Sequence, residues 1–331
     1  MTADSVLVDP LAALLRGPAV HALRVCLAVP MSGALGLTGS SALACAVLAA
    51  EEINAAGGRR GRRLELVLLD AGRAPEIVAG ELLRLVDARV VDAVCGYHTS
   101  DVHRRLELVT AGRLPYIFTP PHEGGTRREG VVLLGESPRE QLMPVMAQLA
   151  SRPSPRRWAL VGNDYIWPWA VHAAAGPMLR AAGAEVVLHE LVPFGGVDGE
   201  RLIGHLLRAR AQAVLLSLVG RDLATFNRMF RHAGLDGRML RVSGALEENG
   251  LLEAGGDDSG ELYAAMRWFA SEPGSDELAV RYTERWGPTA PSLGAYAQGC
   301  YWGIRFLAGL GVPRVRVRLA RADGLALTVV R

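Results

Sequence analysis

The sequence predicts an α/β protein with two lobes, each built around a parallel sheet. Two observations lead to this prediction. Short apolar stretches alternate with helix-like stretches from Arg24 onward, and the alternation begins again after residues 131–134. Strands that alternate with helices at this spacing are typical of doubly wound parallel sheets. The chain has 331 residues, half of them apolar, which is enough to bury two hydrophobic cores.

In the first half, four apolar stretches each end at a turn-rich segment, the pattern of a buried strand that runs into a βα turn. The predicted strands are residues 25–29, 64–70, 90–95 and 114–119. A long helix is expected from Ser41 to about Ala55, because Gly57 and Gly58 follow it. A second helix is expected from Pro75 to Ala88.

The second half repeats the pattern, with strands predicted at residues 158–161, 185–189, 213–217 and 239–242. Residues 260–266 are expected to form a hinge strand, and residues 315–320 and 325–330 a two-strand return around Asp323-Gly324. The chain should cross between the lobes near 131–135 and again near 260–270. The predicted domains are an N-terminal extension (1–23), a first lobe (24–134 with 260–310) and a second lobe (135–259 with 311–331).

Composition excludes several kinds of chemistry. The net charge of +2 gives no reason to expect a nucleic-acid or membrane-surface partner. The chain contains no lysine, so neither a lysine Schiff base nor a phosphate loop with Gly-Lys-Ser/Thr is possible. The four cysteines lie far apart without metal or disulfide spacing, which favours free buried thiols in a reducing compartment.

The first 23 residues do not read as a signal peptide. Asp4 and Asp9 stand where positive charge is needed, and Pro10, Arg16 and Pro18 interrupt the apolar stretches. No run of eighteen apolar residues would span a bilayer. We therefore expect a cytoplasmic protein, or an extracytoplasmic one if a leader was removed.

The sequence does not indicate an enzyme. It has no G-x-S-x-G, H-E-x-x-H or C-x-x-C motif, and the glycines at 33, 36 and 39 lack the spacing of the dinucleotide fingerprint. His98 with Asp101 and His103, or His122 with Glu123, could suggest a metal site. Loop and helix-start residues of this kind are more often solvated or capping, so neither a metal nor a cofactor is expected.

Polar and aromatic residues gather instead at the ends of predicted strands, where open α/β sheets bind ligands. Ser100 could begin a helix and hold a carbonyl or anionic oxygen, and Glu247 or Glu248 could accept from an ammonium or amide N–H. The same acids could simply begin a helix, and Tyr165 and Trp167 could only fill space between strand and helix. The candidate ligand-binding residues are His98, Thr99, Ser100, Phe118, Thr119, Pro120, Tyr165, Trp167, Val219, Ala245, Glu247 and Glu248.

Several of these segments resemble a known family. Residues 30–39 and 52–58 resemble the opening of type I periplasmic-binding-fold proteins, the branched-chain amino-acid and amide receptors. The amide- and urea-binding branch is similar at residues 96–100, 119–124, 245–248 and 162–168, the last reading Gly-Asn-Asp-Tyr-Ile-Trp-Pro. The resemblance runs from about Arg24 to Leu310.

The resemblance implies two Rossmann-like lobes, joined by hinge strands, that close on a small ligand. By motif position it places Ser100, Tyr165 and Trp167 at ligand contacts, with His98, Phe118 and Pro120 beside them. His98 stands where the family pattern has an aromatic such as tyrosine, which implies a more polar or larger ligand. The carboxyl end, residues 311–331, is shorter than in typical members.

Two functions agree with these observations, and both bind a small amide-like or amino-acid-like molecule. The first is a cytoplasmic ligand sensor, expected to be a homo-oligomer, that controls a partner transcription regulator. The second is the substrate-binding component of an ABC importer for amides, urea or branched-chain amino acids, with a permease as partner. The absence of a leader-like sequence puts the sensor first. Direct binding to nucleic acid is not expected, because no DNA-binding helix pair precedes Arg24.

Overall fold

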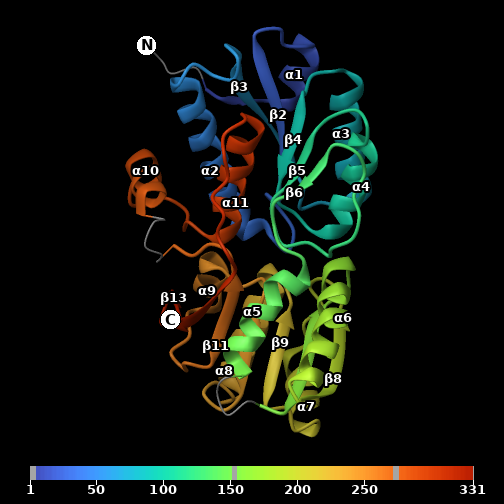
Figure 1. The fold of residues 1–331 in the computed structure, drawn as a ribbon, viewed down its shortest axis with the longest axis vertical. Helices are drawn as coiled ribbons and strands as arrows, with labels where there is room; N and C mark the ends of the chain where they lie inside the picture. Colours follow the sequence, from blue (N-terminus) through green and yellow to red (C-terminus); the bar gives the residue numbers. More distant parts are fainter. Residues whose placement is uncertain (1–4, 151–154, 271–275, 331) are drawn as a thin grey trace.

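The computed structural model describes residues 5–150, 155–270 and 276–330. In it the chain forms two α/β lobes stacked along the long axis of the molecule (Figure 1). Each lobe contains one sheet with helices on both faces, as predicted. This architecture arises because the strand residues are apolar on both faces and must be covered from both sides.

The first lobe contains a parallel sheet of six strands in the order β1-β3-β2-β4-β5-β6. Within β2, Val25, Leu27 and Val29 join the core under one layer of helices, and Cys26 and Ala28 join the core under the other. The strands are β1 Leu7–Val8, β2 Ala22–Val29, β3 Arg63–Asp70, β4 Ala93–Gly96, β5 Tyr116–Phe118 and β6 Val131–Leu133.

Helices α2 and α11 lie side by side on one face of this sheet, and α3 and α4 lie on the other (Figure 1). Helix α10 is attached to α2 through the ion pairs of Arg281 with Glu52 and Arg285 with Glu51. The helices of the lobe are α1 Pro10–Arg16, α2 Gly36–Ala55, α3 Pro75–Asp87, α4 Ser100–Thr110, α10 Asp276–Trp286 and α11 Ala295–Leu307.

The second lobe has a sheet of seven strands in the order β13-β12-β11-β10-β9-β7-β8. All its neighbouring pairs are parallel except β11 with β12 and β12 with β13. The strands are β7 Arg157–Asn163, β8 Glu185–Val192, β9 Ala213–Ser217, β10 Leu240–Ser243, β11 Leu262–Met266, β12 Arg318–Asp323 and β13 Ala326–Val329. The helices are α5 Pro138–Ala150, α6 Ile166–Ala181, α7 Gly199–Arg208, α8 Gly220–His232 and α9 Glu248–Ala254.

Three details differ from the sequence prediction. Part of the predicted N-terminal extension is built into the first lobe, because β1 pairs with β3 and Val6 and Ala13 are buried. Strand β11, predicted within the first lobe, pairs with β10 and β12 in the second sheet, so the chain leaves the second lobe only after it. Helix α2 begins at Gly36 instead of Ser41, because Gly39 has no Cβ to collide with the Pro30 carbonyl.

The two lobes are in direct contact across their interface. The backbone N–H of Arg221 at the start of α8 donates to the Ala34 carbonyl before α2, over 3.1 Å. Further along α2, the Asn249 amide of α9 reaches the Ser41 hydroxyl over 3.5 Å. The structure therefore represents a closed arrangement of the lobes. None of the helices that the structure describes is long and apolar enough to cross a bilayer.

Candidate functional site

A small cavity lies between the lobes, at the carboxyl ends of the strands. The space open to the centre of a water molecule inside it is about 20 Å³. It is lined from both lobes by Leu35, Tyr97, His98, Thr99, Ser100, Pro120, Pro121, Tyr165, Trp167, Val219 and Tyr296. Ser100 from the first lobe and Tyr165 from the second thus meet at one cavity, as the two-lobe prediction requires.

Seven of the candidate residues line this cavity, and five do not: Phe118, Thr119, Ala245, Glu247 and Glu248. Phe118 is fully buried, and its ring stacks on that of His103 with ring centroids 4.0 Å apart. The Thr119 hydroxyl donates to the Gly96 carbonyl over 3.2 Å and lines a neighbouring hollow between the lobes. The Ala245 carbonyl lies 3.5 Å from the hydroxyl of Tyr296.

Glu247 and Glu248 both accept hydrogen bonds from other groups of the protein. Glu247 is the N-cap of α9 and accepts from the Gly250 N–H over 3.1 Å and from the Asn249 amide over 2.9 Å. Glu248 accepts from the Ala270 N–H over 2.6 Å. Glu247 therefore begins a helix, which was the alternative to a ligand-binding role for the acids at this strand end. Burial raises its pKa to about 7.

Four helices begin at the cavity without a side-chain cap. Their N-cap residues, Leu35, Thr99, Tyr165 and Val219, all line it, and none accepts a capping hydrogen bond through its side chain. Asp9, Asp198 and Glu247 cap α1, α7 and α9 through their side chains, whereas α3 and α11 also begin without such a cap. The first N–H groups of a helix carry partial positive charge, so the uncapped ends create a positive potential at the cavity.

One polar side chain at the cavity is buried without a partner in the described chain. Trp167 is 4% exposed, and its Nε1–H has no acceptor there. A buried donor left unsatisfied costs about 1–3 kcal/mol, so this N–H is suited to a bound molecule. Ser100, the first residue of α4, also lines the cavity, and its hydroxyl can donate to or accept from a bound molecule.

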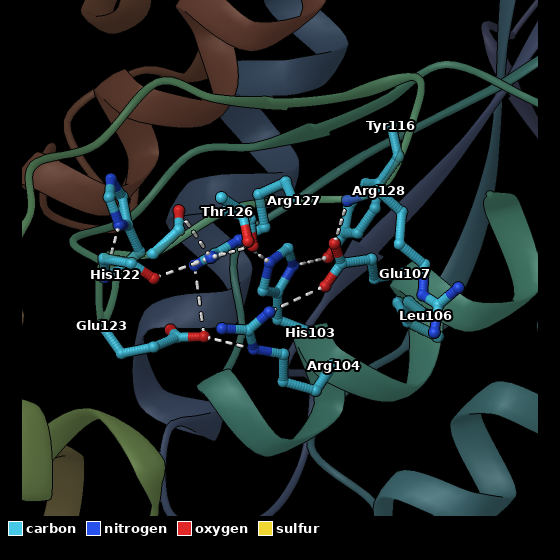
Figure 2. A network of polar contacts seen from close by, with 12 residues as sticks. His103, Arg104, Leu106, Glu107, Tyr116, His122, Glu123, Thr126, Arg127 and Arg128 are labelled. Carbon is cyan, nitrogen blue, oxygen red and sulfur yellow. Dashed lines mark hydrogen bonds and ion pairs between the residues drawn. The ribbon is translucent and has the colours of Figure 1, made fainter. Parts of the chain in front are cut away.

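A chain of hydrogen bonds within the first lobe holds His98 in place, and Figure 2 shows part of this chain. The Tyr116 hydroxyl lies 3.0 Å from His98 Nε2 and 2.8 Å from His103 Nδ1. Arg127 donates from Nε to His103 Nε2 over 3.0 Å. Figure 2 also shows Glu123 between Arg127 and Arg104, with ion-pair distances of 3.2 and 2.6 Å, which fixes the guanidinium in place.

The direction of this chain follows from arginine being a donor only. His103 Nε2 must accept, so its Nδ1–H donates to Tyr116, and the Tyr116 hydroxyl donates to His98. The remaining His98 proton, on Nδ1, faces the Thr99 carbonyl at 3.2 Å. Burial lowers the pKa of His98 to about 4 and that of His103 to about 2, so both are neutral near pH 7. His98 therefore offers the cavity a ring rather than a free nitrogen, which removes the reason for inferring a more polar ligand.

Sequence reasoning missed four lining residues. Tyr97 and Tyr296 stack with ring centroids 4.2 Å apart and an interplanar angle of 8°, and the Tyr97 hydroxyl lies 2.6 Å from that of Thr38. Tyr97 and Pro121 belong to strand-end segments that the sequence had singled out. Leu35 sits in the glycine-rich turn, but Tyr296 lies in the first turn of α11 and carries no local signal.

Among residues 5–150, 155–270 and 276–330, no three His, Cys, Asp or Glu side chains come together in a way that could hold a metal ion. His98 and His103 belong to the hydrogen-bond chain, and His122 accepts from the Gly124 N–H over 3.0 Å. The four cysteines are buried and unpaired.

Two α/β lobes closed over a cavity define a two-lobe ligand-binding protein. A family model described as periplasmic binding protein matches residues 22–314. The chain therefore belongs to the periplasmic binding protein family, which confirms the predicted type I fold. Its members are substrate-binding proteins rather than enzymes, which confirms the expectation that this chain is not an enzyme.

Individual relatives agree with this assignment. Leu/Ile/Val-binding protein homolog 7 of Brucella suis biovar 1 (strain 1330) is 26% identical over 309 residues, with 85% of this chain and 75% of that protein covered. A fatty acid ABC transporter substrate-binding protein from Thermomonospora curvata has a similar structure, with a TM-score of 0.80, 16% identity and coverage of 95% and 93%. A branched-chain amino acid transporter substrate-binding protein from Streptococcus pneumoniae, in complex with isoleucine, gives a TM-score of 0.78, 16% identity and coverage of 93% and 99%.

Proposed function

We propose that this protein is the substrate-binding component of an ABC importer and closes its two lobes on a small organic molecule. The observation that supports this proposal most is the cavity itself. Both lobes line it, Trp167 places a buried N–H without a partner in the described chain there, and Ser100 adds a hydroxyl. The relatives support the importer, because those named above include a Leu/Ile/Val-binding homolog and two ABC transporter substrate-binding proteins.

Binding is coupled to closure because the contacts come from different lobes. Ser100 and the start of α4 belong to the first lobe, whereas Tyr165 and Trp167 belong to the second. Only the closed arrangement lets one molecule touch both sets, so a ligand shifts the population toward closure. The free space in the arrangement described here is about that of one water molecule, so the lobes must stand somewhat further apart when an organic ligand is bound between them.

The cytoplasmic sensor, which the sequence placed first, finds no support among the relatives. The importer requires the protein to work outside the cytoplasm, and we include that location in the proposal. Fractionation of native cells, with detection by antibody, separates the two functions. Recovery in the cytoplasm together with a transcription regulator would establish the sensor, whereas co-purification with a membrane permease would establish the importer.

The ligand contacts are tested by substitution. A thermal-shift screen of amino acids, amides, carboxylates and sugars identifies a binder, and calorimetry then compares variants. We expect Ser100→Ala to weaken binding by about 1 kcal/mol or more, and Tyr165→Ala to weaken it further through lost contact area. Thr283→Ala, at an exposed position on α10, is the control. Unchanged affinity in both cavity variants would show that the ligand binds elsewhere.

A further inference from the structure

We propose that the ligand is a small carboxylate with an apolar or aromatic body and without an ammonium group. This inference rests on the proposed function and names its substrate class. It begins with the charges around the cavity. No Asp, Glu or Arg is among the lining residues, so no side chain there offers a full charge of either sign.

The electrostatic asymmetry comes from the backbone. Helices α2, α4, α6 and α8 all start at the cavity without a side-chain cap, two from each lobe. Their partial positive charges favour an anion and oppose a cation. Closing the lobes brings the two pairs of helix ends onto the same molecule, so the anion itself strengthens closure.

The buried side chains point to the same ligand. The Trp167 Nε1–H is a donor only, and it has no acceptor in the described chain. The Ser100 hydroxyl at the start of α4 can also donate. A carboxylate presents acceptors only, so it can satisfy both donors, whereas an ammonium group has no lone pair and can satisfy neither.

An ammonium group would lack its usual partner. Glu247 and Glu248, the two acids at this strand end, lie outside the cavity lining. Glu247 already accepts from the α9 backbone and from Asn249, and Glu248 accepts from Ala270. Both nitrogens of His98 bond within the first lobe. Asp101, in the first turn of α4, has a buried Oδ1 without a hydrogen-bond partner in the described chain, but it lines a neighbouring hollow rather than this cavity. An ammonium group inside the cavity would therefore lie beside positive helix ends with no carboxylate among the lining residues.

The aromatic rings that complete the cavity lining determine the chemistry of the rest of the ligand. Tyr97 and Tyr296 form a stacked pair, and Tyr165 and Trp167 lie on the facing lobe with ring centroids 6.5 Å apart. Planar or branched apolar groups bury area against such surfaces without needing hydrogen bonds. The cavity thus combines helix N-termini that favour an anion with aromatic rings that favour an apolar group.

Matched ligands test the charge requirement by calorimetry at pH 7 on the full chain. The probes are 4-methylpentanoate, L-leucine and 3-methylbutylamine, which share one apolar body, and benzoate with benzamide. We expect each carboxylate to bind about tenfold or more tightly than its amide or amino-acid counterpart, and the amine not to bind. L-leucine binding more tightly than 4-methylpentanoate, or benzamide more tightly than benzoate, would overturn the proposal.

A pair of tryptophan variants tests the donor. Trp167→Phe keeps a ring and removes the N–H, and we expect it to weaken benzoate binding by about fivefold to tenfold while changing benzamide binding less. Trp169→Phe is the control, because Trp169 is 53% exposed and donates to Asp164 outside the cavity. Equal loss for both ligands would assign Trp167 a shape role only and overturn its part in the proposal. Circular dichroism and thermal unfolding establish that the variants are folded.

The two proposals fail in different ways. If the screen finds ligands that close the lobes, but they are amines, amino acids or sugars and no carboxylate competes, the inference about charge is wrong and the binding function stands. If no compound in any class changes the scattering profile or the melting temperature, the proposed function is wrong as well.

Discussion

Gly220 is the residue whose replacement should hold the lobes apart without unfolding either of them. It begins α8 with φ of +51°, beside the interlobe hydrogen bond from Arg221 to Ala34. An added Cβ would overlap the Ala34 carbonyl and lie 3.3 Å from the Cα of Leu35. These are backbone atoms of the other lobe, so they cannot turn aside as a side chain could. The lobes would have to separate by about 1 Å at this point.

The size of the effect follows from the interactions that closure would lose. The interlobe hydrogen bond contributes about 1 kcal/mol, and the loosened contacts around Leu35 and Val219 contribute a similar amount or more. A closed state destabilised by roughly 2–3 kcal/mol corresponds to about a 30- to 150-fold loss of ligand affinity. Gly220→Ala also introduces a left-handed backbone strain of about 1 kcal/mol, which a control must reproduce.

Gly237→Ala provides that control. Gly237 has φ of +68° and no heavy atom within 4 Å of an added Cβ, so it carries the strain without the collision. The assays are calorimetric titration with the ligand found by screening and small-angle scattering with and without that ligand. We expect similar melting temperatures for the two variants, but weak binding and no compaction for Gly220→Ala alone. Equal affinity in both variants would refute the role of this contact in closure.

Two further predictions concern stability. Burial lowers the pKa of four histidines: to about 4 for His98, 2 for His103 and 3 for His172, and below its usual value for His122. Lowered pKa values stabilise the folded state above pH 6.5 and cease to do so as the pH falls, so His98, His103 and His172 should each cost roughly 2 kcal/mol by pH 5. Glu247 acts in the opposite direction, since its raised pKa stabilises the folded state at low pH and this is lost as the pH rises through about 7; it should offset about one histidine. Urea denaturation at pH 7 and pH 5 measures the net loss, and equal midpoints would contradict it. In the second lobe, Asp257→Ala should cost about 3–5 kcal/mol, because it leaves the fully buried Arg241 without the carboxylate 2.7 Å away. Asp258→Ala, at the exposed neighbouring position, should change stability little, and similar urea midpoints for the two variants would refute the assignment.

The order of strands and helices could be predicted because it depends on local patterns. The apolar strand at residues 157–163 is followed at once by the start of α6, and the same transition recurs at each βα turn. Hydrophobic periodicity and turn residues are properties of neighbouring positions, so they survive in the sequence alone. The same patterns predicted that Ser100, Tyr165 and Val219 would lie at strand ends, and in the structure all three line the cavity.

Only the tertiary structure decided which of those strand-end groups face a ligand. Glu247 and Ser100 both follow a strand at or near the start of a helix, but Glu247 accepts from the Gly250 N–H of α9, whereas Ser100 lines the cavity. Tyr296 reaches the cavity from α11, far along the chain from its stacking partner Tyr97. The physical reason is that hydrogen-bond partners and packing neighbours are chosen across long sequence separations, where local patterns carry no information. The sequence by itself therefore determined the two lobes and the edge at which a ligand would bind, and the packing of distant segments determined the chemistry of the cavity.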